Sequence, residues 1–275
     1  MKLKMKLMAA AVALAASAGA NAAMDNFATG NGSLAFIALD SVGSPISMMM
    51  DLDFNVNSFL STAALTSTAG NTIQWNFNTN TLMINNVVQA GAQTNWSGAM
   101  STFAGTAQAA DTKWAVIGGD STTTGGLGEV RYLTTSNTAL ATLQGQTKAN
   151  LLSMSLVDAL YVANPQVGTN GSTATSGAAY VGSASFGTTG KWATKFVGNA
   201  FANEGQAADF WMLDSNNGTL TTRALVTPYV GEFAYAAGVL TYSVAAVPEP
   251  SEYALMLAGL GMIGFMARRR LNNRA

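Results

Sequence analysis

The side chains that could do chemistry in this sequence are mainly carboxylates, because the chain contains neither histidine nor cysteine. That absence excludes the Ser-His-Asp and Cys-His arrangements, the common zinc sites and disulfides. Asp209 and Asp214 bracket the aromatic stretch Phe210-Trp211, and two carboxylates about 5–9 Å apart can hydrolyse a polysaccharide. Asp214 also precedes a turn, where aspartate is common. We therefore expect no catalytic residue and no enzymatic activity.

Tryptophan rings offer a second chemistry, because they can stack on sugar rings. The chain has five of them: Trp75, Trp96, Trp114, Trp192 and Trp211. Stacking without catalysis would make the chain a carbohydrate-binding module, and we keep this as the alternative function. Exposed tryptophans on a flat face would favour that alternative, whereas buried ones would favour a structural role.

One polar pattern resembles the first half of a calcium loop, with an oxygen-bearing side chain at every second position: Asp51, Asp53, Asn55 and Asn57. An EF-hand loop requires glycine at its sixth position and glutamate at its twelfth. Val56 and Thr62 stand there instead. We read the pattern as the polar face of a strand and expect no metal site and no cofactor. The alternative is a calcium site in which Asp51 and Asp53 act with a loop carboxylate.

Two glycine-rich stretches could be mistaken for nucleotide sites. Gly187 to Lys191 hints at a phosphate loop, but Ser185 replaces its first glycine and Trp192 follows its lysine. Gly259 to Gly264 spells the dinucleotide fingerprint without the preceding strand or the following acidic residue that the site needs. We reject both motifs.

The elements that must position these side chains are predicted to be strands, because apolar and polar residues alternate with a period of two. In the first of these segments both faces are apolar, which predicts a strand buried on both sides. An Asn-Gly step between two of the segments predicts a tight hairpin turn at 216–218. The predicted strands lie at residues 34–39, 48–57, 73–78, 113–118, 128–133, 209–215, 219–226 and within 233–244.

A single helix is predicted from Gln146 to Ala163, where Leu152, Leu156 and Leu160 recur every four residues. Asn164-Pro165 would end it. Many strands with one helix predict a mostly β fold, an antiparallel β-sandwich that is jelly-roll-like.

The N-terminal residues have the form of a secretory signal peptide. Lys2, Lys4 and Lys6 precede an apolar run, and Ala20-Asn21-Ala22 satisfies the rule for cleavage by signal peptidase. We expect cleavage after Ala22 and export of the chain that follows.

The C-terminal residues predict a single transmembrane helix. Tyr253 to Ala267 is uncharged and would form a helix of roughly 22 Å, which is short for a bilayer. Arg268, Arg269 and Arg270 follow and would stay on the cytoplasmic side, so the preceding chain would lie outside. Before the helix, Val247-Pro248-Glu249-Pro250 favours an extended, exposed peptide.

These three features, Pro248-Glu249-Pro250, the apolar helix and the arginine cluster, together resemble the PEP-CTERM sorting signal. The resemblance covers residues 247–275. It implies recognition by exosortase in the inner membrane of a Gram-negative bacterium, removal of the tail, and a connection with extracellular polysaccharide and biofilm. The alternative is an unprocessed membrane anchor.

We therefore divide the chain into a signal peptide (1–22), a β-rich ectodomain (23–246) and a sorting signal (247–275). Of the 13 basic and 14 acidic residues, the two end segments hold seven and two, which leaves six basic and 12 acidic residues and a net charge near −6 in the ectodomain. So few cations exclude nucleic acid as a partner. We expect a structural or adhesive protein of the cell surface or matrix, with exosortase, signal peptidase and extracellular polysaccharide as partners and only transient contact with the inner membrane.

Overall fold

The computed structural model describes residues 24–27, 30–61, 67–92, 94–121, 130–153, 158–164, 169–182, 201–215, 218–245, 256–260 and 262–263. The chain divides into two units, Met1–Val244 and Ala245–Ala275. In the second unit, residues 256–260 and 262–263 are helical. No helix in the described part of the chain is long and apolar enough to cross a membrane. The predicted membrane helix, the cleavage residues Ala20 and Ala22, the motif Val247–Pro250 and the cluster Arg268–Arg270 lie wholly or largely outside the described residues.

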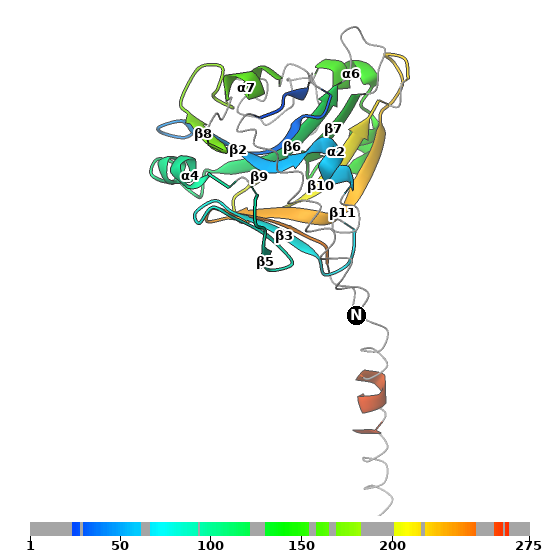
Figure 1. The fold of residues 1–275 in the computed structure, drawn as a ribbon. Coiled ribbons are helices and arrows are strands. Elements are labelled where there is room, and N and C mark those ends of the chain that lie inside the picture. The colour runs from blue at the N-terminus through cyan, green and yellow to red at the C-terminus, as the bar shows by residue number, and fades with distance from the viewer. Residues whose placement is uncertain are drawn as a thin grey trace, which may run out of the picture. The chain divides into compact units, whose positions relative to one another are not determined.

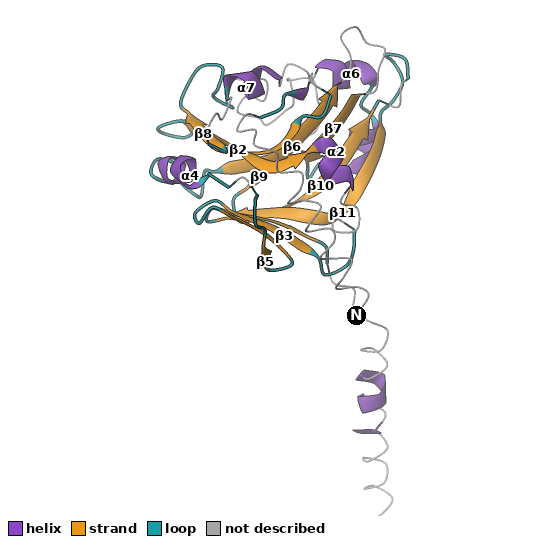
Figure 2. Ribbon diagram, in the orientation of Figure 1, coloured by secondary structure: helices purple, strands orange, loops and turns teal. Residues whose placement is uncertain are grey.

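The first unit is built on one antiparallel sheet, in the order β5-β4-β3-β12-β11-β10-β7-β6-β1-β2-β8, with β9 beside β6 (Figures 1 and 2). Its strands are β1 (Ser33–Asp40), β2 (Ile46–Asn55), β3 (Thr72–Asn76), β4 (Thr81–Ile84), β5 (Val87–Val88), β6 (Lys113–Ser121), β7 (Val130–Thr135), β8 (Gly171–Ala174), β9 (Ala202–Asn203), β10 (Ala207–Asp214), β11 (Leu225–Ala236) and β12 (Val239–Ser243). The mostly β, antiparallel fold predicted from alternation is confirmed.

The sheet is curled into a half-barrel, so that its two ends face each other across an inner core. Phe36 of β1 and Met50 of β2 share this core with Trp75 of β3 and Leu240 of β12. The Trp75 indole N–H donates to the Leu52 carbonyl at 2.8 Å and joins the facing ends directly. One continuous curled sheet thus takes the place of the two sheets that a sandwich or jelly roll would have.

A second core covers the outer face of β1, β6 and β7. Alternate residues of β1 point into it, so every residue of that strand is buried, as its two apolar faces predict. Short helices supply the cover: Leu143 comes from α5 (Leu140–Gln144), Leu151 from α6 (Lys148–Ser153), and Leu160 with Tyr161 from α7 (Asp158–Ala163).

The helical prediction for Gln146–Ala163 is confirmed in part. α6 and α7 both lie in that range, and residues 154–157 between them lie outside the described residues. The pattern did not reveal α2 (Val56–Ser61), α4 (Ser97–Ala104) or α5. In α2 the reason is local: the Ser58 hydroxyl accepts the Asn55 N–H at 2.8 Å and ends β2, so the predicted strand 48–57 stops two residues early.

β10 and β11 pair antiparallel as predicted, but the tight hairpin turn predicted at 216–218 is wrong, because the second strand begins only at Leu225 and not at Thr219. β10 and β11 pair from Asp214–Leu225 onward, whereas Gly218–Ala224 form turns and a single bridge. These residues bond to the start of α6 instead: the N–H of Lys148 donates to the Thr222 carbonyl, and that of Ala149 to the Leu220 carbonyl, both at 3.0 Å. Residues 216–217 lie outside the described residues.

Candidate functional site

The described tryptophans are structural. Trp75, Trp96 and Trp114 are fully buried and Trp211 is 8% exposed. Each indole N–H donates to a backbone carbonyl, at 2.7 to 3.0 Å, of Leu52, Asp51, Asn203 and Ser136 respectively. None of these four rings forms a stacking platform for a sugar, and Trp192 lies outside the described residues, as does Gly187–Lys191.

The carboxylates Asp209 and Asp214 do not form a pair. Both lie on β10, where Asp209 is opposite Glu232 and Asp214 is opposite Leu225 and Arg131. Five residues along a strand separate them by roughly 16 Å, well beyond the reach of an acid and its partner carboxylate in glycoside hydrolysis. The candidate hydrolytic site is therefore not assembled from these two residues.

Asp51 and Asp53 have unlike surroundings. The Asp51 carboxylate is buried, where it accepts the Asp53 N–H at 2.9 Å and the Ser33 hydroxyl at 3.4 Å. Burial, together with the nearby charges of Asp53 and Asp25, raises the pKa of Asp51 to about 7. The expected polar, exposed face of β2 is thus wrong at Asp51. Among the residues described here, no group of three or more acidic side chains is placed to hold a metal ion.

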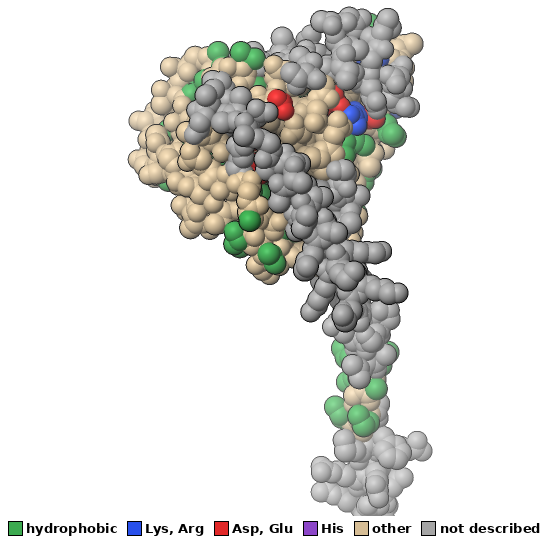
Figure 3. Space-filling model, in the orientation of Figure 1, with side chains coloured by type: hydrophobic (Ala, Val, Ile, Leu, Met, Phe, Trp, Pro, Cys, Tyr) green, Lys and Arg blue, Asp and Glu red, His purple; other side chains and the backbone are tan. Residues whose placement is uncertain are grey.

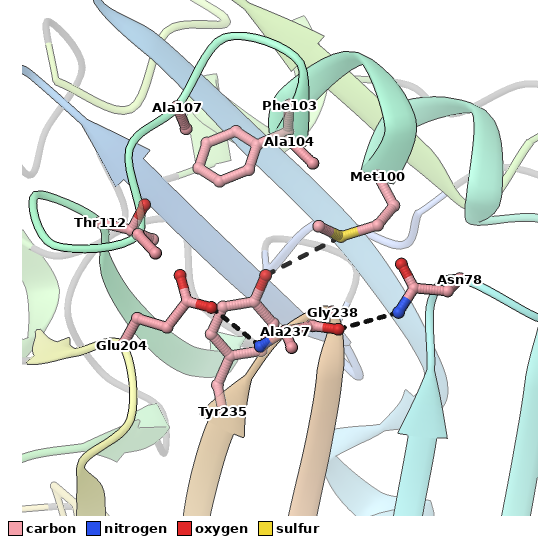
Figure 4. A pocket seen from close by; sticks show the side chains of 11 residues that line it. Asn78, Met100, Phe103, Ala104, Ala107, Thr112, Glu204, Tyr235, Ala237 and Gly238 are labelled. Carbon is pink, nitrogen blue, oxygen red and sulfur yellow. Dashed lines mark hydrogen bonds between the residues drawn. The ribbon is translucent and has the colours of Figure 1, made fainter.

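A cavity of about 240 Å³ opens where four turns meet, and it is the candidate site (Figure 4). Its walls come from the β3–β4 turn, the last turn of α4 with the loop that follows, the β9–β10 turn and the β11–β12 turn. The lining residues are Asn78, Met100, Phe103, Ala104, Ala107, Ala109, Thr112, Glu204, Tyr235, Ala237 and Gly238.

Glu204 supplies the only formal charge in this lining. Its Oε1 accepts the Ala237 N–H at 2.8 Å, and its other oxygen points into the cavity (Figure 4). The backbone of Glu204 is held by its own N–H, which donates to the Thr112 carbonyl at 3.0 Å, and by the next N–H, of Gly205, which donates to the Tyr235 carbonyl at 2.9 Å. Within the described residues Glu204 forms no ion pair.

The wall beside Glu204 is fixed by the turn between β11 and β12. Asn78 Nδ2 donates to the Ala237 carbonyl at 2.9 Å, and the Phe77 N–H donates to the Gly238 carbonyl at 3.0 Å. Gly238 has φ +78°, and a Cβ there would come within 2.5 Å of Asn78 Nδ2. Glycine is therefore required for this close approach.

The floor of the cavity is aromatic and leads into the inner core. Tyr235 packs on Phe36 with ring centroids 4.7 Å apart, and its hydroxyl donates to Met100 Sδ at 3.8 Å. Burial raises the pKa of Tyr235, and the charge of Glu204 raises it further, so the phenol stays neutral. The site thus combines one carboxylate and one amide with an apolar wall.

Sequence reasoning missed this site. The glycines of its turns were visible, but nothing local shows that residues near 78, 104, 204 and 238 meet. Their meeting depends on β12 lying beside β3 and β9 beside β6.

Comparison with known proteins identifies the C-terminal segment. Residues 246–270 match the family model described as the PEP-CTERM protein-sorting motif. No curated protein and no solved structure matches the chain. The PEP-CTERM motif is the recognition signal for exosortase processing and implies sorting to the cell surface.

Proposed function

We propose that this chain is an exported, non-enzymatic protein with a structural or adhesive role at the surface of a Gram-negative bacterium, within the extracellular polysaccharide of a biofilm. The observation that carries the proposal is the sorting motif at residues 246–270. In this proposal signal peptidase cuts after Ala22, and the segment Tyr253–Ala267 holds the tail in the inner membrane until exosortase removes it.

The structural role is supported by how the described residues use their chemistry. The four described tryptophans are buried in the core, and Asp209 and Asp214 are too far apart to act together in hydrolysis. The face in Figure 3 carries few charged side chains among uncharged polar groups and backbone in its described part. Such a surface suits a hydrated polysaccharide better than catalysis or nucleic-acid binding.

Intact mass of the protein recovered from the surface and the medium of its native host tests the proposal. We expect a chain that begins near Ala23 and ends near Pro250. A mass that runs to Ala275 would show a plain anchor in the inner membrane and overturn the sorting function.

A matched pair of variants sharpens that measurement. Replacing both Pro248 and Pro250 by alanine should leave the tail in place, because the extended motif is lost. Ser251→Ala, which changes a neighbouring residue outside the motif, should be processed like the natural chain. Equal processing of both variants would contradict a role for the Pro-Glu-Pro step.

A further inference from the structure

We propose that the cavity around Glu204 binds a compact ring-shaped ligand that carries a protonated primary amine, of the size of one amino-sugar unit. This binding site goes beyond the sorting and the structural role proposed above and does not depend on them.

The Glu204 carboxylate is held in position and is not neutralised by a cation among the described residues. Glu204 Oε1 is held by the Ala237 N–H, whereas the second oxygen has no partner among the described residues and faces the cavity (Figure 4). The backbone on both sides of Glu204 is anchored to Thr112 and Tyr235. A carboxylate fixed in this way is ready to accept a charge-assisted hydrogen bond without losing side-chain freedom on binding.

The other groups around the Glu204 carboxylate also favour a cation. Phe103 and Ala104, in the last turn of α4, line the cavity, so the negative end of that helix dipole lies at its wall. Asn78 uses its Nδ2 on the Ala237 carbonyl, and its Oδ1 lies on the cavity side (Figure 4). The Thr112 hydroxyl donates to the Gln108 carbonyl at 2.9 Å, which leaves its oxygen as an acceptor.

The lining fits an organic ammonium group better than a metal ion. Calcium and magnesium take six or more oxygen ligands, usually with carboxylates among them, and Glu204 is the one carboxylate in the lining. Zinc favours histidine and cysteine, which the chain lacks. An ammonium group needs only about three acceptors. The wall formed by Met100, Phe103 and Ala107 would meanwhile pack against the CH groups of a ring. A protonated amine on a small ring satisfies both the polar and the apolar side.

Calorimetric titration of the purified full-length protein tests the site with three probes, at low salt and at a pH where the amines are protonated. The probes are glucosamine, N-acetylglucosamine, in which the same ring has no charged amine, and cyclohexylamine, which has the amine without hydroxyl groups. We expect glucosamine to bind, N-acetylglucosamine not to bind, and binding to weaken as salt is raised to about 0.15 M.

Three variants complete the test. Glu204→Gln keeps an oxygen for the Ala237 N–H and removes the charge, so it should weaken glucosamine binding at least about tenfold. Ala104→Leu should do the same by filling the cavity from an exposed helix position that tolerates leucine. Glu232→Gln, an identical change on an exposed residue of β11, should leave binding unchanged.

Tighter binding of glucosamine than of cyclohexylamine supports an amino sugar as the natural ligand, and the reverse supports a less polar ring amine, with the ammonium site upheld in both cases. The proposal is overturned if neither amine binds, if N-acetylglucosamine binds as well as glucosamine, or if Glu204→Gln binds as tightly as the natural chain.

Discussion

Asp51 and Glu204 are both carboxylates held by a backbone N–H, yet the fold treats them in opposite ways. Asp51 is enclosed beside the inner core, bonded through both oxygens, with Asp53 and Asp25 close enough to repel its charge. Glu204 is half-buried at the edge of a cavity and keeps one oxygen open. Burial beside like charges therefore favours the neutral form of a carboxylic acid, whereas a position at the edge of a cavity keeps the charge available to a ligand.

The largest expected effect is the pH dependence caused by Asp51. Its pKa is about 7 in the folded chain against 3.8 as the ordinary value, so between those limits the folded state binds more protons than the unfolded state. Stability therefore falls as pH rises through that window, by up to roughly 4 kcal/mol. Asp51→Asn should abolish this loss, which urea unfolding near pH 4 and near pH 8 would measure.

The matched control for Asp51 is Asp209→Asn, which removes an exposed carboxylate from β10. The loss of stability that Asp51 causes between pH 4 and pH 8 should remain in this variant. If Asp51→Asn also kept the natural slope, the buried-acid side of the comparison would be wrong.

The next effect concerns a third carboxylate, which is buried and paired. Asp120 of β6 is 2% exposed and forms an ion pair with Arg131 of β7, which also donates to Asn57 Oδ1 at 2.9 Å. Arg131→Met leaves the buried charge without its partner and should cost about 3 kcal/mol of unfolding free energy. Urea unfolding measures this loss. Adding Asp120→Asn to that variant should recover part of it, and no recovery would mean that the arginine acts through packing alone.

A smaller effect tests the wall of the cavity. Gly238→Ala combines a positive φ with a clash against Asn78 and should cost about 2 kcal/mol in thermal or urea unfolding. Gly205→Ala is the control, because its φ is +83° and nothing lies within 4 Å of the added Cβ. It should cost about 1 kcal/mol. Equal losses would show that the contact with Asn78 imposes no constraint.

The alternation of apolar and polar residues predicted these strands because the pattern lies within each strand's own sequence. β1, β3 and β6 lie where the apolar residues of 34–39, 73–78 and 113–118 placed them. The curl of the sheet could not be read in the same way, because it follows from contacts between distant strands such as Trp75 with Leu52. The burial of Asp51 could not be predicted for a related reason. Its N–H donates to the carbonyl of Asn170, so the segment that leads into β8 lies against β2 and covers a position that the alternation alone would leave exposed.

The sequence predicted the sorting segment far better than the cavity. The segment is a linear signal, and its match at residues 246–270 confirms the resemblance on which it was proposed. The cavity is made of single residues from four turns, and Glu204 carries no local pattern that distinguishes it from any other surface glutamate. The pairing of β9 with β6 brings it to Thr112, and the pairing of β10 with β11 brings it to Tyr235.

Glu204→Gln should have the smallest effect on the unfolding free energy. Glutamine can still accept the Ala237 N–H, and the oxygen that faces the cavity has no partner in the described residues to lose. The unfolding free energy should therefore change by no more than about 0.5 kcal/mol, measured by urea unfolding beside Glu232→Gln as control. A loss well above 1 kcal/mol would mean that the carboxylate stabilises the turn. In that case Glu204 would belong with Asp120 as a structural charge, and the contrast with Asp51 would rest on burial alone.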